Sequence, residues 1–554
     1  MNRFALFLTV LASSTVFSEQ NTDQHRIGSA ATAHPLATET AELIYQRGGN
    51  AVDAAVAASF VLSVVEPSMS GLGGRAQAVI RTESGRFVGF NGMTEIPESY
   101  ALSKDMPDHG FSTVATPGLV ALLWDMHSKY GVLPFKQVIS PAIEFAEKGF
   151  QILPGEAIRH QSVKEKIISN EGMRAVFINN LGNVFSPEEL LKQPELAKTL
   201  RKIAFNGSDA FYRGDIAKVM SDDIQKGGGF VTEQDLKNYK VLEGRYISFQ
   251  YRDVTVHTLA APAGGGLVAK ALMLMSHYDL ESYDDRKWAV IVSQAIALSI
   301  ESMSENYYEK DLKLLIDPNW AKLNIKRIIS PSLNVNSVEL ISSDPDMNDT
   351  DWVGQPRAHT SHLVTSDCSG LVVSMTQTIG PIFGAKVASP SLGFAYAATM
   401  GGYLRTGPQK PGERPRTAIA PVIVTKEDSV LLALGAAGGI RIPSAIVQTI
   451  SRVVDQNKSL KDAINAPRVH PLALIDENNR RIIDLRSFSA EMSSPAWTEN
   501  DLAYWKLNGF NVTELEKRAT FGRVHAISQF NAKLVGVSDP DWEGSASTEK
   551  NCAK

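Results

Sequence analysis

The sequence has few cysteines, little excess charge and no long hydrophobic run, and each shortage excludes a class of protein. Two cysteines, Cys368 and Cys552, cannot build a framework of several disulfides. The 55 basic and 60 acidic residues leave a net charge of −5, so no basic field attracts nucleic acid or anionic lipid. With 44% hydrophobic and 21% charged residues among 554, the composition is that of an ordinary globular protein.

Familiar catalytic motifs are also missing. The chain has no Gly-x-Ser-x-Gly elbow, no His-Glu-x-x-His helix, no Gly-x4-Gly-Lys-Ser/Thr phosphate loop and no set of zinc ligands. Residues 71–76 fit a dinucleotide fingerprint loosely, but they follow a predicted helix rather than a strand. We therefore interpret them as a tight turn, and we expect no metal or organic cofactor.

The N-terminus is typical of an export signal. A short basic start precedes a mostly apolar run, residues 4–17, and polar residues follow from Ser18. A membrane anchor is the alternative, but the run is shorter than the ~20 residues that a span needs, and no later segment reaches that length. We expect residues 1–18 to be removed and the product to be secreted or periplasmic, with no stable membrane anchor.

Helical and strand-like patterns alternate along the chain, with no internal repeat. Glycine, asparagine and proline signals bound the predicted helices, and short alternating apolar runs predict the strands. This alternation alone indicates an α/β or α+β protein. The predicted helices are 38–46, 51–65, much of 118–234, 287–313 and a helix with Pro443 in its first turn; the strands are 76–81, 251–259, 362–366, 371–378 and 430–434; residues 344–358 form an exposed polar segment.

Thr360 lies where that polar segment ends and a predicted strand begins. If the backbone were cut before Thr360, its new α-amine and its hydroxyl would belong to one residue. An α-amine has a pKa of ~7.7–8.0, so near neutral pH it can act as the base for its own hydroxyl. The alternative is a threonine that simply starts a strand, since threonine favours strands.

Gly438 and Gly439 follow the strand predicted at 430–434 and precede a helix. Glycines let backbone N–H groups approach a ligand closely, and a helix N-terminus adds positive partial charge. The turn can therefore stabilise the oxyanion of an acyl transfer. An ordinary strand-to-helix turn is the alternative.

Longer motifs run along most of the chain, including Ser70-Gly71-Leu72-Gly73-Gly74 and Thr360-Ser361-His362. Others lie at residues 33–39, 48–54, 65–67, 114–118, 230–236, 262–265, 414–415, 438–439, 466–470, 521–522 and 538–540. In this order, over roughly residues 26 to 546, they resemble the γ-glutamyltransferase (γ-glutamyltranspeptidase) family of N-terminal nucleophile hydrolases.

The resemblance implies an α+β fold, a four-layer αββα sandwich in one large interleaved domain. It implies that the precursor cleaves itself between His359 and Thr360 into residues 19–359 and 360–554, which stay together. Thr360 then corresponds to the nucleophile, Thr378 to the threonine that positions the new amine, and Gly438 and Gly439 to the oxyanion glycines.

The departures from the family cluster in the pocket for the acyl group. The family's carboxylate-binding arginine is Met93 here, its asparagine after the second threonine is Gly380, its serine pair is Thr417 and Ala418, and its Asn-x-Met-Asp-Asp-Phe segment is residues 396–402. A methionine cannot pair with a carboxylate, and a glycine-rich loop cannot hold an ammonium. Losing one charged contact to a buried ligand costs ~2–5 kcal/mol, so tight γ-glutamyl binding needs replacement contacts.

An arginine elsewhere can replace the lost carboxylate contact. Arg75 stands where the family loop usually carries an aromatic residue, and Arg405 and Arg416 are further candidates. A solvated surface arginine is the alternative for each. The hypothesis is sharpest for Arg75, because it follows a glycine loop expected near the pocket.

The sequence therefore predicts an exported, self-processing threonine amidohydrolase acting on γ-glutamyl amides such as glutathione or on similar small carboxylate-bearing amides. Hydrolysis is favoured over transpeptidation, because no acceptor site is recognisable. One alternative is a family member with another acyl specificity, of the oxamate or β-lactam-acylase type. Another is an inactive binding protein with the family fold, which the retained Thr360 and Thr378 argue against.

Overall fold

The computed structural model describes residues 26–101, 107–306, 309–329, 358–400, 410–475, 481–493, 496–516, 520–541 and 543–552. The expected signal peptide, residues 344–357 of the predicted polar segment, and Arg405 lie outside these ranges.

The helices α1 (Pro35–Gln46) and α2 (Ala51–Val65) confirm the two helices predicted there. The Asn50 side chain accepts hydrogen bonds from the first turn of α2, and the Asp53 carboxylate accepts one from the Asn50 N–H in return. Such a reciprocal cap satisfies N–H groups that a helix start leaves without partners. Every residue of α2 is buried, as its nearly uniform apolar sequence predicts.

Two seven-stranded sheets form the centre of the molecule, and neighbouring strands within each are antiparallel. The first has the order β18 (Ser545–Ala546), β1 (Gly28–Thr32), β9 (Ala358–Asp367), β10 (Val372–Pro381), β2 (Arg75–Arg81), β3 (Phe87–Gly92), β6 (Leu242–Glu243). The second has the order β19 (Lys550–Asn551), β17 (Lys533–Ser538), β16 (Arg523–Phe530), β12 (Ser429–Ala437), β11 (Val422–Lys426), β8 (Val254–Leu259), β7 (Tyr246–Tyr251).

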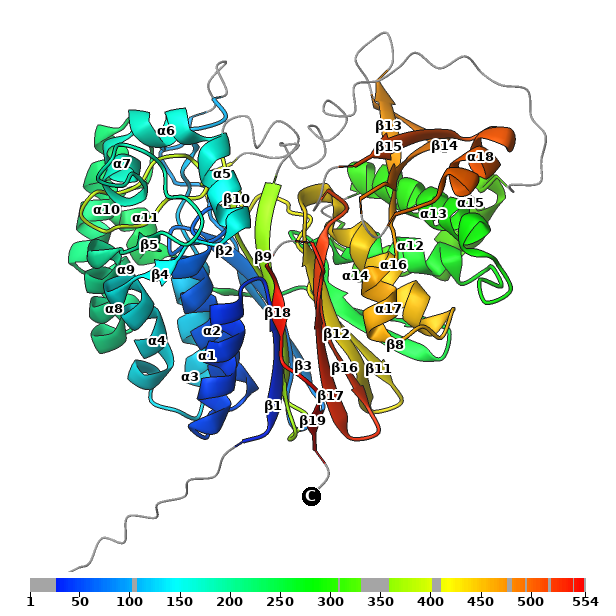
Figure 1. Cartoon of the computed structure of the whole chain (residues 1–554), viewed down its shortest axis with the longest axis horizontal. Coiled ribbons are helices and arrows are strands. Elements are labelled where there is room, and N and C mark those ends of the chain that lie inside the picture. Colours follow the sequence, from blue (N-terminus) through cyan, green and yellow to red (C-terminus); the bar gives the residue numbers. More distant parts are fainter. Residues whose placement is uncertain are drawn as a thin grey trace, which may run out of the picture.

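Helices cover the outer faces of both sheets (Figure 1). The first sheet carries α1 to α11, the remaining ones being α3 (Leu119–Tyr130), α4 (Phe135–Lys148), α5 (Pro154–Ser162), α6 (Lys164–Ser169), α7 (Glu171–Phe177), α8 (Pro194–Asn206), α9 (Ser208–Tyr212), α10 (Asp215–Lys226) and α11 (Glu233–Asn238), with the small strands β4 (Phe150–Gln151) and β5 (Leu190–Leu191). The second carries α12 (Gly265–Met275), α13 (Asp285–Asn306), α14 (Leu312–Leu315), α15 (Pro318–Asn324), α16 (Ile442–Val454), α17 (Leu460–Asn465) and α18 (Glu499–Leu507), with the sheet of β13 (Val469–Ile475), β14 (Arg481–Glu491) and β15 (Asn511–Leu515).

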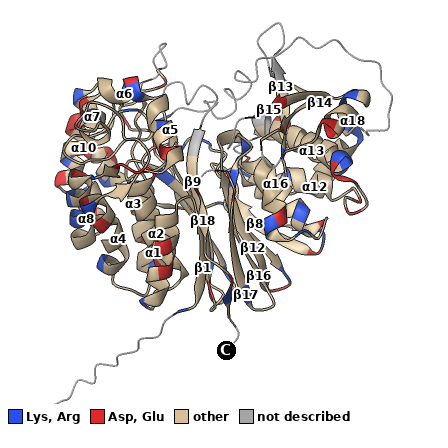
Figure 2. Cartoon of the chain, viewed as in Figure 1, with Lys and Arg blue, Asp and Glu red and all other residues tan. Residues whose placement is uncertain are grey.

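The hydrophobic core is divided by the sheets. One cluster lies between each sheet and its helices, and a smaller one, including Val79, Val364, Ile423 and Ile527, joins strands of both sheets. In Figure 2 both signs of charge are scattered over the outer helices, while the strands are almost free of them. Within the described ranges, no helix combines the length and the apolar character that crossing a bilayer takes.

The strand predicted at 251–259 is wrong in extent. Residues 246–259 form a hairpin, in which β7 ends at Tyr251 and β8 begins at Val254. The turn between them holds Arg252 at a φ of 57°, a conformation that non-glycine residues rarely adopt. The turn also contains Asp253, a common turn residue, but the sequence analysis did not recognise it as a break.

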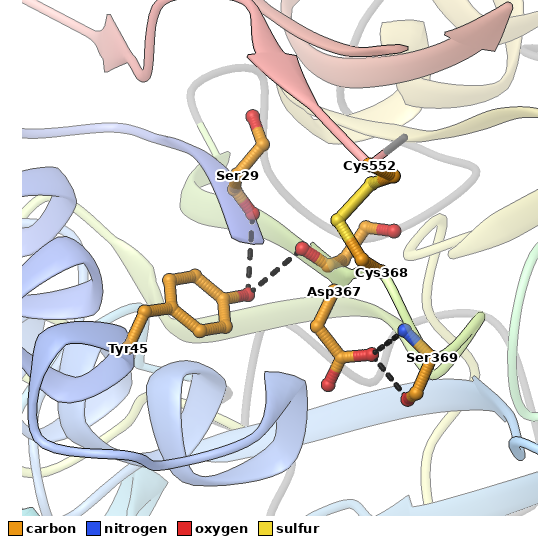
Figure 3. The surroundings of a disulfide bond; sticks show 7 residues. Ser29, Tyr45, Asp367, Cys368, Ser369 and Cys552 are labelled. Atoms are coloured by element: carbon orange, nitrogen blue, oxygen red, sulfur yellow. Dashed lines mark hydrogen bonds between the residues drawn. A yellow bond between two sulfur atoms is a disulfide. The ribbon is translucent and has the colours of Figure 1, made fainter. Parts of the chain in front are cut away.

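Cys368 and Cys552 form a disulfide with a Cα–Cα distance of 5.2 Å (Figure 3). It joins the turn between β9 and β10 to the segment after β19. The same turn is held by the Ser369 N–H, which donates to Asp367 Oδ1 at 2.9 Å, and by the Cys368 N–H, which donates to the Ile27 carbonyl at 3.1 Å. The sequence left the state of Cys368 open, and the disulfide resolves it.

Candidate active site

Thr360 lies in β9 opposite an irregularity in β10. Ser361 pairs with Gln377 and His359 with Gly380, so Thr378 and Ile379 together face Thr360. Such bulges re-aim side chains and are common beside active sites. The Thr360 hydroxyl lies 3.5 Å from the Thr378 hydroxyl, and both side chains are buried. The structure thus brings together the two threonines that the sequence singled out.

Thr378 is itself fixed by the backbone. Its Oγ1 accepts a hydrogen bond from the Gly380 N–H at 2.8 Å. Gly380 itself adopts a φ of +93°, a conformation that favours glycine. The bulge, the Thr378 hydroxyl and the glycine therefore form one unit facing Thr360.

A buried ion pair holds the other side of Thr360. Arg523, the first residue of β16, donates from Nη2 to the Thr360 carbonyl at 3.1 Å. Its Nη1 lies 3.6 Å from Glu66 Oε1, and the Ser361 hydroxyl donates to Glu66 Oε2 at 2.5 Å. Glu66 thus contacts both the residue after Thr360 and the arginine that binds the Thr360 carbonyl.

The ion pair extends into a larger buried network. Arg159 Nη2 lies 3.5 Å from Glu66 Oε1 and 2.5 Å from Glu156 Oε2. Burial raises the pKa of Glu66, although Arg523 and Arg159 oppose the shift. Burial would also raise the pKa of Glu156, but Arg159 and His160 outweigh it and hold that pKa below its usual range. The sequence analysis did not single out these residues. Glu156, Arg159 and His160 lie within one turn of α5, whereas their contact with Glu66 depends on the fold.

Gly438 and Gly439 form the predicted turn between β12 and α16. Their φ values are 138° and 59°, in the region that favours glycine. A Cβ atom on Gly438 would lie 2.7 Å from the Cα of Gly522, so a side chain has no room there. The 3-10 turn that follows, Gly439–Arg441, contacts strand β9. The glycine turn therefore lies against the strand that carries Thr360.

Arg75 is buried next to Gly380. It pairs in register with Thr378, and its Nη2 lies 3.6 Å from where a Cβ of Gly380 would be. Its Nη1 donates to the Thr399 hydroxyl at 2.8 Å and to the Ala398 carbonyl at 3.2 Å. Arg75, Gly380 and residues 398–399 of the segment 396–402, which all depart from the family pattern, are thus neighbours; residues 401–402 lie outside the described ranges. The interpretation of Arg75 as a surface arginine is wrong.

Met93 is connected to the contact between Arg75 and Thr399 through the next residue, Thr94. Its side chain is buried, its N–H donates to Asn91 Oδ1 at 3.1 Å, and its carbonyl accepts from the Tyr239 hydroxyl at 2.7 Å. The next hydroxyl, on Thr94, lies 3.1 Å from that of Thr399, which binds Arg75.

Thr417 and Ala418 are held by the loop between β8 and α12. The Thr417 N–H donates to the Pro262 carbonyl at 2.8 Å, and a Cβ on Gly264 would lie 2.7 Å from the Ala418 carbonyl oxygen. Arg416 is half-buried beside them. Among the described residues, no group of three or more His, Cys, Asp or Glu side chains is arranged to hold a metal ion.

Comparisons with known proteins agree over nearly the whole chain. The family model described as Gamma-glutamyltranspeptidase matches residues 37–549. The Glutathione hydrolase proenzyme of Bacillus subtilis (strain 168) is 32% identical, covering 95% of this chain and 92% of its own. The Acylase ACY 1 proenzyme of Pseudomonas sp. (strain V22) is 29% identical, covering 80% and 82%. The crystal structure of cephalosporin acylase from Bacillus halodurans shares the fold, with a TM-score of 0.80, 24% identity, and coverage of 95% and 96%.

Proposed function

Because the chain belongs to the gamma-glutamyltranspeptidase family of enzymes, we propose that it is a self-processing threonine amidohydrolase that cleaves small carboxylate-bearing amides, γ-glutamyl or similar. One observation carries the proposal: the hydroxyls of Thr360 and Thr378 lie 3.5 Å apart, and β9, the strand that carries Thr360, contacts the glycine turn. The relatives named as proenzymes support processing. We assign the two sheets and their helices to the four-layer αββα sandwich of N-terminal nucleophile hydrolases.

Self-cleavage would create the catalytic group. The Thr360 hydroxyl attacks the His359 carbonyl, the peptide C–N bond breaks to give an ester and a free Thr360 amine, and water hydrolyses the ester. Arg523 holds the Thr360 carbonyl during these steps. The products are a large chain ending at His359 and a small chain beginning at Thr360.

The new amine then serves as the base. It takes the proton of the Thr360 hydroxyl as that oxygen attacks the substrate carbonyl, and the N–H groups of Gly438 and Gly439 stabilise the oxyanion. The amide C–N bond breaks as the leaving amine takes the proton, which leaves an acyl ester on Thr360. Water, or an acceptor amine, then releases the acyl group and restores the hydroxyl.

The acyl pocket supports a changed specificity. Arg75 would bind the substrate carboxylate in place of the family arginine, whose position is Met93 here; its place beside Thr378 and Gly380 supports this role. This altered pocket favours, as a second candidate, an acylase that accepts acyl groups other than γ-glutamyl. At the family's serine pair, Thr417 keeps a hydroxyl, whereas Ala418 has none.

The two chains would remain together, because their strands are interleaved. In the first sheet, β18, β10 and all of β9 from Thr360 onward come from residues 360–554, while β1, β2, β3 and β6 come from residues 19–359. Separating the chains would break the ladders β18–β1, β1–β9 and β10–β2, and also β11–β8 in the second sheet. The disulfide supports export, since disulfides persist in oxidising compartments.

Intact mass of the purified protein tests the proposal, with Thr360→Ala as the variant. We expect two fragments that meet at Thr360 in the wild type and a single chain in the variant. Thr255→Ala, a half-exposed threonine in β8, is the matched control and should be processed. An uncut wild type, or a cut that persists in Thr360→Ala, would refute self-processing by Thr360. Processed protein is then profiled with γ-glutamyl and other acyl amides, which separates the two candidate specificities.

A further inference from the structure

A cavity of about 600 Å³ lies between α12, α13 and residues 309–327. Its lining includes Lys270, Glu309, Asp317 and Trp320 together with leucines of α14. It includes none of the residues assigned to the active site. The volume is in the range of small-molecule binding sites.

Lys270 lies at this cavity, although most of the residue is buried. Only 3% of the residue is accessible, and its Nζ lies 4.2 Å from the centre of the Trp320 ring. Among the described residues, nothing accepts a hydrogen bond from this ammonium or forms an ion pair with it. Burial lowers the pKa of Lys270 to about 8, so at neutral pH most molecules still carry the ammonium. The ammonium is therefore available to a negatively charged group that enters the cavity.

Three carboxylates line the cavity, and one of them, Glu301, is already paired with Arg327. The other two do not pair with the lysine. The charges of Asp317 and Glu309 act on Lys270, and they oppose the effect of burial on its pKa. Each is held by one oxygen: Asp317 Oδ1 accepts from the Asn319 N–H at 3.0 Å, and Glu309 Oε1 from the Asp311 N–H at 2.9 Å. Their second oxygens leave further acceptor capacity. Opposite charges are thus held apart across a cavity.

We propose that this cavity binds a small zwitterion, an α-amino acid with an apolar side chain. Its carboxylate pairs with the Lys270 ammonium, and its ammonium pairs with Asp317 and Glu309. Its side chain packs against the Trp320 ring and the leucines of α14. The inference is independent of the proposed catalytic function, because it concerns a separate cavity.

Calorimetry on the purified protein with three matched probes tests this inference. The probes are L-leucine, 3-methylbutylamine, which lacks the carboxylate, and 4-methylpentanoate, which lacks the ammonium. We expect leucine to bind with a Kd below about 1 mM, and each analogue to bind at least about tenfold more weakly. Equal binding of leucine and 4-methylpentanoate would overturn the zwitterion assignment, and no detectable leucine binding would overturn the site.

Lys270→Met is the informative variant, because methionine fills similar space without a charge to bury. It should weaken leucine binding at least about tenfold, whereas Lys322→Met, on the exposed face of α15, should not. A second readout keeps the inference testable if the variant folds poorly. In the wild type, leucine should slow the acylation of the Lys270 amine, followed by peptide mass, and leave that of Lys322 unchanged. Equal labelling of Lys270 with and without leucine would overturn the assignment.

Discussion

Replacing Gly438 by alanine tests the oxyanion turn. The added Cβ would lie 2.7 Å from the Cα of Gly522, a contact between two backbone segments that no side-chain rotation relieves. The φ of 138° adds strain of ~1–3 kcal/mol for a residue with a side chain. The turn must therefore shift, and on the proposed mechanism its N–H groups would leave the position assigned to the oxyanion. Removing one such donor costs ~2.7–4 kcal/mol, so kcat should fall about 100- to 1000-fold.

The assay is steady-state kinetics of processed protein with the best amide found by profiling, with processing followed by intact mass. Gly182→Ala is the control, because Gly182 also has a positive φ, 78°, but an added Cβ meets no atom within 4 Å. It should lose a little stability and keep its kcat. If Gly438→Ala keeps a kcat within about twofold of the wild type, or if Gly182→Ala loses as much, the oxyanion role of the turn is refuted.

Three further predictions concern other groups. Arg523→Gln removes a charged hydrogen bond to the Thr360 carbonyl, worth ~1.5–3 kcal/mol, and should slow self-cleavage about ten- to a hundredfold in a time course by mass; an unchanged rate would contradict this role. Arg75→Ala should raise KM for carboxylate-bearing amides far more than for uncharged ones, unlike the exposed control Arg86→Ala; an unchanged KM for every amide would exclude Arg75 as the anchor. Burial lowers the pKa of His362 to about 3, so the folded protein keeps this imidazole neutral. The free energy of unfolding is therefore unaffected by protonation of His362 above pH 6.5 and falls by ~1.4 kcal/mol per pH unit as the pH drops from 6.5 towards 3. Unfolding midpoints of His362→Gln should therefore depend less on pH in that window, and an identical slope would disprove it.

Local sequence signals made helices predictable. Contacts between residues far apart in the chain could not be predicted in this way. The Asn50 cap and its apolar helix are contained in one short stretch, and the structure confirms them. The hairpin at Arg252 was missed because its turn uses a positive φ without glycine. Glu66 and Arg523 meet although 457 positions separate them, and no local pattern marks one as the partner of the other.

Within the candidate site, the sequence identified the residue types but not all their surroundings. Thr360 and the glycine turn had a physical rationale of their own, whereas the match to Thr378 came from resemblance. The position of Arg75 beside Gly380 follows from the register between β2 and β10, which no single-sequence pattern determines. The disulfide likewise depends on the fold bringing together two cysteines 184 positions apart.

The disulfide also indicates where a dye or a solid surface can be coupled to the molecule without lying close to Thr360. Cys368 bonds to Cys552 and to the Ile27 carbonyl, so both ends of the described chain lie at the turn where β9 finishes. Thr360 is eight residues earlier in the same strand, about 26 Å away at 3.3 Å per residue. A dye or a solid surface coupled near residue 26 or residue 552 would therefore be attached at the end of β9 that lies away from Thr360.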